Sequence, residues 1–273
     1  MKGQESLTQL LALCRVYDSL HSDYVSRGVS SIRDPNDKEN TNTEPWHALH
    51  YMDVGYDAIR LIASSLMTSL RQPPRNILDF PCGSGRVTRH LRAFFPDAAI
   101  GACDLYESHI DFCVHNFGAM PILSKENLDE LDIGSKWDLI FCGSLLTHLP
   151  PDLFVSALKF IARSLSDTGI ALITLEGRHA EFIQKHKWKL VPDDLYEVAE
   201  ATIDSKGYGY VDYQHSMKSL FFKQDSYGVM LARPRWTIQI VEQMYEVRVL
   251  GYIERGWDDH QDVLVIGRPG VDS

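Results

Sequence analysis

The sequence predicts an α/β protein with a mostly parallel sheet, and three observations support that prediction. Between residues 75 and 178, apolar runs of strand length alternate with amphipathic segments of helical length. The apolar runs are continuous, which is typical of parallel strands buried on both faces. Two further strand-like runs follow each other across a short loop near the end of the chain, so we expect them to form an antiparallel pair.

The elements are expected in a regular order. Helical periodicity covers residues 7–20 and 51–70, and the polar, turn-rich segment 34–43 between them is expected to be a mobile loop. The last strand pair is expected at 245–253 and 262–266. The alternating part predicts strands at 76–80, 99–104, 121–123, 137–142 and 169–175, and helices at 86–95, 106–117 and 151–165.

Composition limits the classes of partner. The chain has 273 residues and a net charge of −10, and an acidic surface disfavours a nucleic-acid partner. No apolar run approaches about 18 residues, and residues 1–17 lack the apolar core and cleavage site of a signal peptide, so we expect no membrane span and a cytoplasmic location. The five cysteines are scattered without Cys-x-x-Cys spacing, which predicts reduced thiols and no metal site. The sequence makes no prediction of oligomeric state.

The most informative segment is 76–86. An apolar run ends at Asp79, and a turn containing Gly83 and Gly85 leads directly into a helix. This order places a tight loop at a helix N-terminus, the usual seat of a nucleotide-like cofactor. A carboxylate there repels a pyrophosphate but attracts the ammonium end of S-adenosylmethionine (SAM). Thr88 replaces the third glycine of the dinucleotide fingerprint, which also favours SAM over NAD.

The motifs along the chain resemble those of class I SAM-dependent methyltransferases over residues 51–175 and the final strand pair. The motifs that carry the resemblance are the loop 78–85, Asp104 at the end of the second strand, Glu126-Asn127 after the third, and the fourth-strand segment 137–144. The resemblance implies a Rossmann-like, seven-stranded, mostly parallel sheet with an antiparallel final strand and helices on both faces. An N-terminal helical cap and an insertion after the fifth strand would complete the fold.

The resemblance also implies which residues hold SAM. Asp79 is expected to engage the methionine ammonium; alternatively, it is an acid favoured by the helix dipole. Asp104 is expected to accept hydrogen bonds from the ribose hydroxyls, a role that NAD enzymes share. Glu126 or Asn127 is expected at the adenine amino group, unless their charged surroundings are simply solvated. The full set of expected cofactor contacts is Asp79, Pro81, Cys82, Gly83, Ser84, Gly85, Asp104, Leu105, Glu126, Asn127, Gly143 and Ser144.

Candidates for acid–base catalysis lie near predicted strand ends. Methyl transfer from a sulfonium is an in-line displacement, which needs a base only when the acceptor must lose a proton. His148 follows the fourth strand, Glu176 ends the fifth, and His179 and His215 lie beyond it. For His148 a capping or packing role is the alternative. No cluster of metal ligands accompanies these residues.

The resemblance implies methyl transfer from SAM to a small-molecule acceptor, with S-adenosylhomocysteine (SAH) as product. The tail 251–262 looks similar to a bacterial methyltransferase subgroup whose members accompany glycan or secondary-metabolite biosynthesis, so a hydroxyl of a sugar or secondary metabolite is the expected acceptor. The alternatives are a non-catalytic scaffold with the same fold and an NAD(P)-dependent oxidoreductase.

The chain is expected to divide into four regions: a helical cap at 1–74, the SAM-binding core at 75–178, an insertion covering the active site at 179–236, and strands that complete the core sheet at 237–273. The tyrosines between 196 and 227 suit a sugar or aromatic acceptor, or else form an aromatic mini-core of the insertion.

Overall fold

The computed structural model describes residues 2–37, 39, 44–187, 189, 191–212 and 227–269. The chain forms two compact units, which are described one at a time. Unit 1 comprises Met1–Leu123 and Trp137–Leu139, and unit 2 comprises Ser124–Lys136 and Ile140–Ser273.

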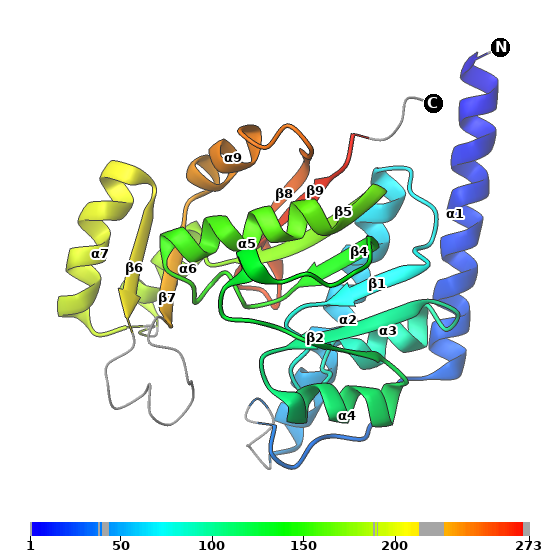
Figure 1. Cartoon of the computed structure of the whole chain (residues 1–273), viewed down its shortest axis with the longest axis horizontal. Helices are drawn as coiled ribbons and strands as arrows, with labels where there is room; N and C mark the ends of the chain where they lie inside the picture. Colours follow the sequence, from blue (N-terminus) through cyan, green and yellow to red (C-terminus); the bar gives the residue numbers. More distant parts are fainter. Residues whose placement is uncertain are drawn as a thin grey trace. The chain divides into compact units, whose positions relative to one another are not determined.

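Seven strands form the main sheet in the order β3-β2-β1-β4-β5-β9-β8 (Figure 1). Strand β1 pairs in parallel with β2, and β2 with β3, whereas β9 is antiparallel to both β5 and β8. The strands are β1 Asn76–Asp79, β2 Ala99–Asp104, β3 Met120–Leu123, β4 Trp137–Cys142, β5 Leu165–Leu175, β8 Arg248–Trp257 and β9 Gln261–Gly267. The predicted fold class, a mostly parallel seven-stranded sheet with an antiparallel final strand, is confirmed.

In unit 1, helices α1 (Lys2–Arg27) and α2 (Pro45–Thr68) both contact α3 (Thr88–Phe94), which follows β1. Helix α4 (Glu107–Phe117) connects β2 to β3 and ends at Gly118, whose positive φ and backbone N–H bonds close the last turn. Strand β1 buries its last three residues, so its apolar run ends at the buried Asp79.

In unit 2, a short 3₁₀ helix η2 (Leu128–Glu130) precedes α5 (Pro151–Ser164). Helix α5 has a strongly amphipathic pattern and begins with a proline, which suits the first turn because its missing N–H has no intrahelical partner there. Helix α9 (Pro234–Glu242), which precedes β8, begins in the same way.

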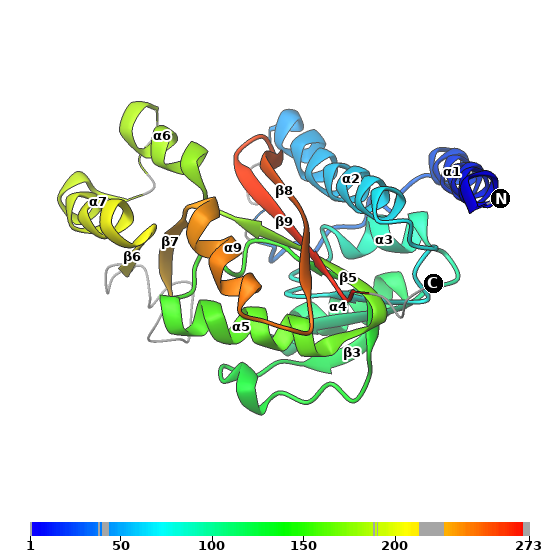
Figure 2. The same cartoon turned by 90° about the horizontal axis from the view of Figure 1, so that it is seen from above.

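The segment after β5 has secondary structure of its own. Helices α6 (Arg178–His186) and α7 (Asp193–Lys206) are grouped with an antiparallel pair, β6 (Tyr208–Asp212) and β7 (Gly228–Ala232) (Figure 2). Their shared core cluster contains Ala180, Val191, Tyr196, Ala199, Ile203, Val211, Val229 and Leu231. Tyr196 is only 5% exposed, so for this tyrosine the mini-core interpretation is correct.

Several predicted boundaries shift. Helix α5 ends at Ser164 and β5 begins at Leu165, because the chain passes from helix to strand without the loop predicted before residue 169. Helix α3 begins two residues later than predicted, since the glycine-rich turn extends through Val87. The last two strands pair as far as Trp257 and Gln261, which lengthens the hairpin beyond the predicted ranges. The division into four regions stays a prediction.

Within the described ranges, no helix has the length and apolar content needed to cross a membrane. The same part of the chain contains no group of three or more His, Cys, Asp or Glu side chains arranged to hold a metal ion.

Candidate active site

The glycine-rich loop of unit 1 is tied by its backbone to the end of β2. Cys82 N–H donates to the Cys103 carbonyl over 2.9 Å, and Gly83 N–H donates to Asp104 Oδ2 over 2.9 Å. Gly83 and Gly85 adopt φ values of +49° and +77°, in the left-handed region that favours glycine. The loop geometry therefore depends on the two glycines and on a carboxylate from the neighbouring strand.

The two glycines differ in the space around them. A Cβ at Gly85 would lie 2.4 Å from Phe117 Cε2, whereas one at Gly83 would meet nothing within 4 Å. We expect Gly83→Ala to cost about 1 kcal/mol from backbone strain alone, and Gly85→Ala about 3 kcal/mol because overpacking adds to that strain. Urea unfolding of the two variants measures the difference. Equal losses of stability would contradict the tight packing at Gly85.

Asp104 ends β2 and is held by several donors. Oδ2 accepts from Gly83 N–H, and Oδ1 accepts from Tyr106 N–H over 3.0 Å. His109 Nδ1 lies 3.3 Å from Oδ1, and this proximity raises the pKa of His109 against the opposing effect of burial. A carboxylate offers about four acceptor positions, so Asp104 can accept from ligand hydroxyls as well.

Asp79 ends β1, the strand parallel to β2, and only 1% of its surface is exposed. Thr88 Oγ1 donates to Asp79 Oδ2 over 2.6 Å. Burial raises the pKa of Asp79 to about 7; the charge of Asp104 adds to the rise, whereas the Thr88 hydrogen bond and Arg86 oppose it. A cation brought to this carboxylate would favour its ionised form.

The segment before α2 is fixed to the glycine-rich loop. Ser84 Oγ donates to Asp34 Oδ2 over 3.2 Å. The buried Arg89 donates through Nε to the Gly85 carbonyl over 2.9 Å and through Nη1 to the Ser30 carbonyl over 3.2 Å. Its guanidinium also lies 5.1 Å from the centre of the Tyr51 ring.

The described part of the predicted loop 34–43 is partly buried, and the mobility of the segment stays a prediction. Asp34 and Asp37 are 9% and 7% exposed, because their carboxylates accept hydrogen bonds from Ser84 and from the Tyr51 hydroxyl. Residues 38 and 40–43 lie outside the described ranges.

The other residues expected around the loop occupy varied positions. Pro81 is half-buried, Ser84 is buried, and Leu105 is 37% exposed. Cys82 is buried, and a hydrogen bond with the Cys113 thiol raises its pKa, with burial adding to the effect. Cys82 is therefore a neutral packing thiol, and it contributes its backbone to the loop.

Glu126 and Asn127, the residues expected at adenine, are both exposed in unit 2. Asn127 caps η2: its Oδ1 accepts from Asp129 N–H over 3.1 Å, and its Nδ2 donates to Glu130 Oε1 over 2.8 Å. Because both ends of the Asn127 amide are engaged in this cap, Glu126 is the better candidate for a polar contact with a ligand.

Ser144 lies two residues beyond β4 and belongs to a polar chain within unit 2. Its φ is +54°, and its backbone N–H donates to Thr174 Oγ1 over 2.8 Å. Gln261 Nε2 lies 3.1 Å from Ser144 Oγ and 3.4 Å from Glu176 Oε1. The structure thus connects two predicted site residues, Ser144 and Glu176, through a glutamine that the sequence interpretation missed. Gly143 beside them packs against Phe141 and Trp257.

Glu176 follows β5 and is 7% exposed. Burial raises its pKa to about 7; His260 lowers it and the nearby Asp262 raises it further. His260 Nε2 lies 3.8 Å from Glu176 Oε1, and His260 Nδ1 lies 2.8 Å from the Asp258 carbonyl oxygen. The other carboxylate oxygen, Oε2, is buried and makes no hydrogen bond with the part of the chain that the structure describes.

Two of the three histidine candidates lie within the described residues, and their surroundings differ. His148 Nδ1 lies 2.8 Å from the Gly228 carbonyl oxygen, and its ring stacks on Tyr227 at 4.5 Å. Burial lowers the pKa of His148. His179 lies on α6, where its ring stacks on Phe182 at 5.9 Å. His215 lies outside the described residues.

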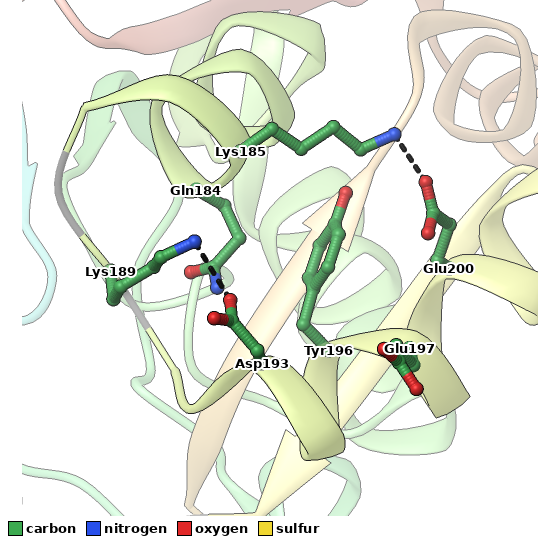
Figure 3. Close-up of a pocket in the computed structure, with 7 residues that line it drawn as sticks. All are labelled: Gln184, Lys185, Lys189, Asp193, Tyr196, Glu197 and Glu200. Atoms are coloured by element: carbon green, nitrogen blue, oxygen red, sulfur yellow. Dashed lines mark ion pairs between the residues drawn. The ribbon is translucent and has the colours of Figure 1, made fainter.

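A surface pocket lies between α6 and α7 (Figure 3). Its ionic groups pair with one another: Lys185 with Glu200, and Lys189 with Asp193 over 2.7 Å. Gln184 bonds the backbone of Val191 at both ends of its amide. We assign no ligand to this pocket, because its polar groups serve to join the two helices.

Comparison with known proteins gives a family match. Residues 78–171 match a family model described as a methyltransferase domain, a range that begins just before the glycine-rich loop and ends within β5. Among curated proteins, the malonyl-[acyl-carrier protein] O-methyltransferase of Anoxybacillus flavithermus is 28% identical over 89 residues, which are 32% of this chain and 34% of that protein. The chain thus matches about a third of the length of this relative.

Solved structures agree in fold. A SAM-dependent methyltransferase from Clostridium acetobutylicum superposes with a TM-score of 0.50 at 13% identity, covering 81% of this chain and 92% of that one. An O-methyltransferase family protein from Burkholderia thailandensis gives 0.51 at 13% identity, covering 97% and 72%. Residues 78–171 thus match the methyltransferase-domain model, and the chain shares the fold of these methyltransferase structures.

Proposed function

We propose that the protein transfers a methyl group from SAM to a hydroxyl of a small molecule and releases SAH. The observation that carries the proposal is the carboxylate of Asp104, fixed by Gly83 N–H beside a loop whose two glycines have positive φ. This loop lies inside the range that matches the methyltransferase domain. One curated relative is named an O-methyltransferase, which supports oxygen as the acceptor atom.

The cofactor-binding roles follow from the chemistry of each group. Asp104 accepts hydrogen bonds from the ribose hydroxyls with lone pairs that its protein donors leave available. The buried Asp79 balances the ammonium of the methionine moiety, either directly or through water. The backbone from Pro81 to Gly85 lies along the ligand, and Leu105 contributes apolar surface. Glu126 bonds the adenine amino group.

On the acceptor side we assign the polar chain of unit 2. Ser144 and Glu176 come from the ends of β4 and β5, and Gln261 fixes both side chains. A carboxylate whose pKa is about 7 is suited to accept a proton near neutral pH. The contacts of His148 and His179 are with Gly228 and with aromatic rings, so we give these histidines a positioning role.

Dinucleotide binding is the less favoured alternative. Thr88, at the position of the third fingerprint glycine, bonds to Asp79, and an acid buried below the loop disfavours a pyrophosphate.

Calorimetric titration of the purified protein with SAM, SAH and NAD tests the cofactor assignment. We expect saturable, micromolar binding of SAM and SAH and no heat with NAD. Incubation with SAM and a panel of methyl glycosides and phenols, with amines for comparison, then tests the acceptor class by SAH release. Binding of NAD alone would contradict the cofactor assignment, and turnover only on amines would contradict the acceptor assignment.

A further inference from the structure

We propose that His260 and Glu176 act together as an acid–base pair that binds the acceptor hydroxyl and takes its proton. The inference rests on the proposed function, because it names the group that removes the proton in that reaction. His260 lies in the turn between β8 and β9, whereas Glu176 follows β5, so residues 84 positions apart in the chain meet at one site.

The contacts of His260 define its chemistry. Nδ1 lies 2.8 Å from the Asp258 carbonyl oxygen, which can only accept a hydrogen bond. In the neutral ring the proton therefore resides on Nδ1, and Nε2 is the basic nitrogen. This arrangement, with one ring nitrogen held by a backbone acceptor and the other used for proton transfer, is common among catalytic histidines.

The separation between the two groups suits a shared ligand. Nε2 is 3.8 Å from Glu176 Oε1, which is too long for a direct hydrogen bond. Because this separation is well under twice a normal hydrogen-bond length of about 2.8 Å, a hydroxyl that donates to the Glu176 carboxylate can lie within reach of Nε2, to which the proton then passes.

The burial and hydrogen bonding of the Glu176 carboxylate also favour a hydroxyl ligand. Oε2 is buried and makes no hydrogen bond with the described part of the chain, which is an uncommon and costly arrangement for a carboxylate oxygen. Gln261 holds Oε1, so the orientation of the carboxyl group is fixed. The charged groups that face Glu176 are His260 and Asp262, and Asp262 is itself held by Tyr252 and by Arg255 N–H. An oriented carboxylate with a buried, unpartnered oxygen is what a hydroxyl ligand would satisfy.

Methyl transfer to the acceptor hydroxyl breaks one C–S bond and releases one proton. The acceptor oxygen attacks the methyl carbon of the sulfonium, the C–O bond forms as the C–S bond breaks, and the bonding pair of the C–S bond stays on sulfur to give the neutral thioether. The hydroxyl proton moves to the Glu176 carboxylate and from there to His260 Nε2, and the ionised Glu176 stabilises the resulting imidazolium. The proton then passes to solvent, because the His260 side chain is 26% exposed.

Nuclear magnetic resonance tests the pair without an acceptor. With ¹⁵N-histidine labelling and assignment by His260→Asn, we expect the neutral His260 ring to carry its proton on Nδ1. With ¹³C-glutamate labelling and assignment by Glu176→Gln, we expect Glu176 to titrate near pH 7, and at higher pH in His260→Asn, which removes the positive charge. A neutral ring protonated on Nε2, or a Glu176 midpoint near 4.5 that ignores His260→Asn, would overturn the proposal.

Turnover on the hydroxyl acceptor found in the panel gives the second test. We expect His260→Asn and Glu176→Gln each to lower kcat by 100-fold or more and to change the acid limb of the pH profile, with SAH affinity unchanged. His115→Asn, an exposed histidine on α4, is the matched control and should keep wild-type turnover. Normal kcat in both variants would overturn the pair but leave the methyltransferase intact. Failure of the wild-type protein to bind SAH would instead contradict the proposed function.

Discussion

Replacing Asp104 with alanine is expected to weaken SAH binding by at least 100-fold. The substitution removes a charged acceptor for two ribose hydroxyls, and a hydrogen bond to a charged group contributes about 1.5–3 kcal/mol. It also leaves Gly83 N–H without its acceptor, so the loop loses the contact that ties it to β2. Calorimetric titration of the variant and the wild-type protein measures the ratio of the two dissociation constants.

Asp97→Ala is the matched control for this measurement. Asp97 is an exposed acid two positions before β2, so the variant loses the same charge without touching the loop. We expect its SAH affinity to stay within about twofold of wild type, because an exposed charge is largely screened. Equal affinities for Asp104→Ala and Asp97→Ala in folded samples would remove Asp104 from the cofactor site.

Asp79→Asn is expected to stabilise the protein at pH 8 while it weakens SAH binding tenfold or more. The folded-state pKa of Asp79 is raised from 3.8 to about 7, so the protonated form stabilises the fold below pH 4 and that contribution is lost as pH rises through 7. At about 1.36 kcal/mol per pH unit, the ionised group costs at most about 4 kcal/mol at pH 8. Asparagine keeps an acceptor for Thr88 without the charge.

Urea unfolding of Asp79→Asn and wild type at pH 5 and pH 8 measures this effect. The variant should gain stability relative to wild type as pH rises, by about 2–3 kcal/mol between the two conditions. Glu176 also titrates near 7, but it is present in both proteins and cancels from the comparison. A difference in stability that is the same at both pH values would show that Asp79 does not titrate in this range.

The opposite effects of Asp79→Asn on stability and on binding have one origin. A carboxylate that is 1% exposed loses its hydration, and Thr88 replaces only part of it. A cationic ligand group supplies the missing compensation, so affinity for SAH should fall as pH drops below about 7. We therefore expect the ionised Asp79 to be more favourable in the complex than in the free protein.

The cofactor end of the fold could be predicted because its information is local. Asp79, Gly83 and Gly85 lie within seven consecutive residues, and their order alone specifies a strand, a turn with positive φ and a helix. Asp104 was predictable for the same reason, since it is the last residue of the next strand. The continuous apolar runs predicted the parallel strands, and the short loop between the last two strands predicted the antiparallel hairpin.

The residues that sequence interpretation missed are those whose partners lie far away in the chain. Gln261 meets Ser144 across 117 positions, and Arg89 meets the Ser30 carbonyl across 59. Long-range hydrogen bonds of this kind depend on the register of β9 against β5 and on the packing of the N-terminal helices. The periodicity of apolar residues specifies neither of these. His260 and Gln261 did stand in a conspicuous segment, the turn of the final hairpin, but nothing local marked them as site residues.

Some details predicted from local sequence differ from the structure, because tertiary contacts override local preferences there. Residues 166–168 were predicted as a loop between a helix and a strand, yet they lie in β5, which begins directly after α5 ends at Ser164. The acids at 34 and 37 are typical loop residues by composition, but Ser84 and Tyr51 bond to them and bury them. Polar composition predicted the loop but gave no sign that these two acids are buried.

A crystal structure with SAH bound tests the central claim most directly. We expect both ribose hydroxyls within hydrogen-bond distance of the Asp104 carboxylate. The amino group of the homocysteine moiety should point toward Asp79, and the ligand should lie along the backbone of Gly83 to Gly85. A nucleoside bound elsewhere, without a hydrogen bond to the Asp104 carboxylate, would contradict it.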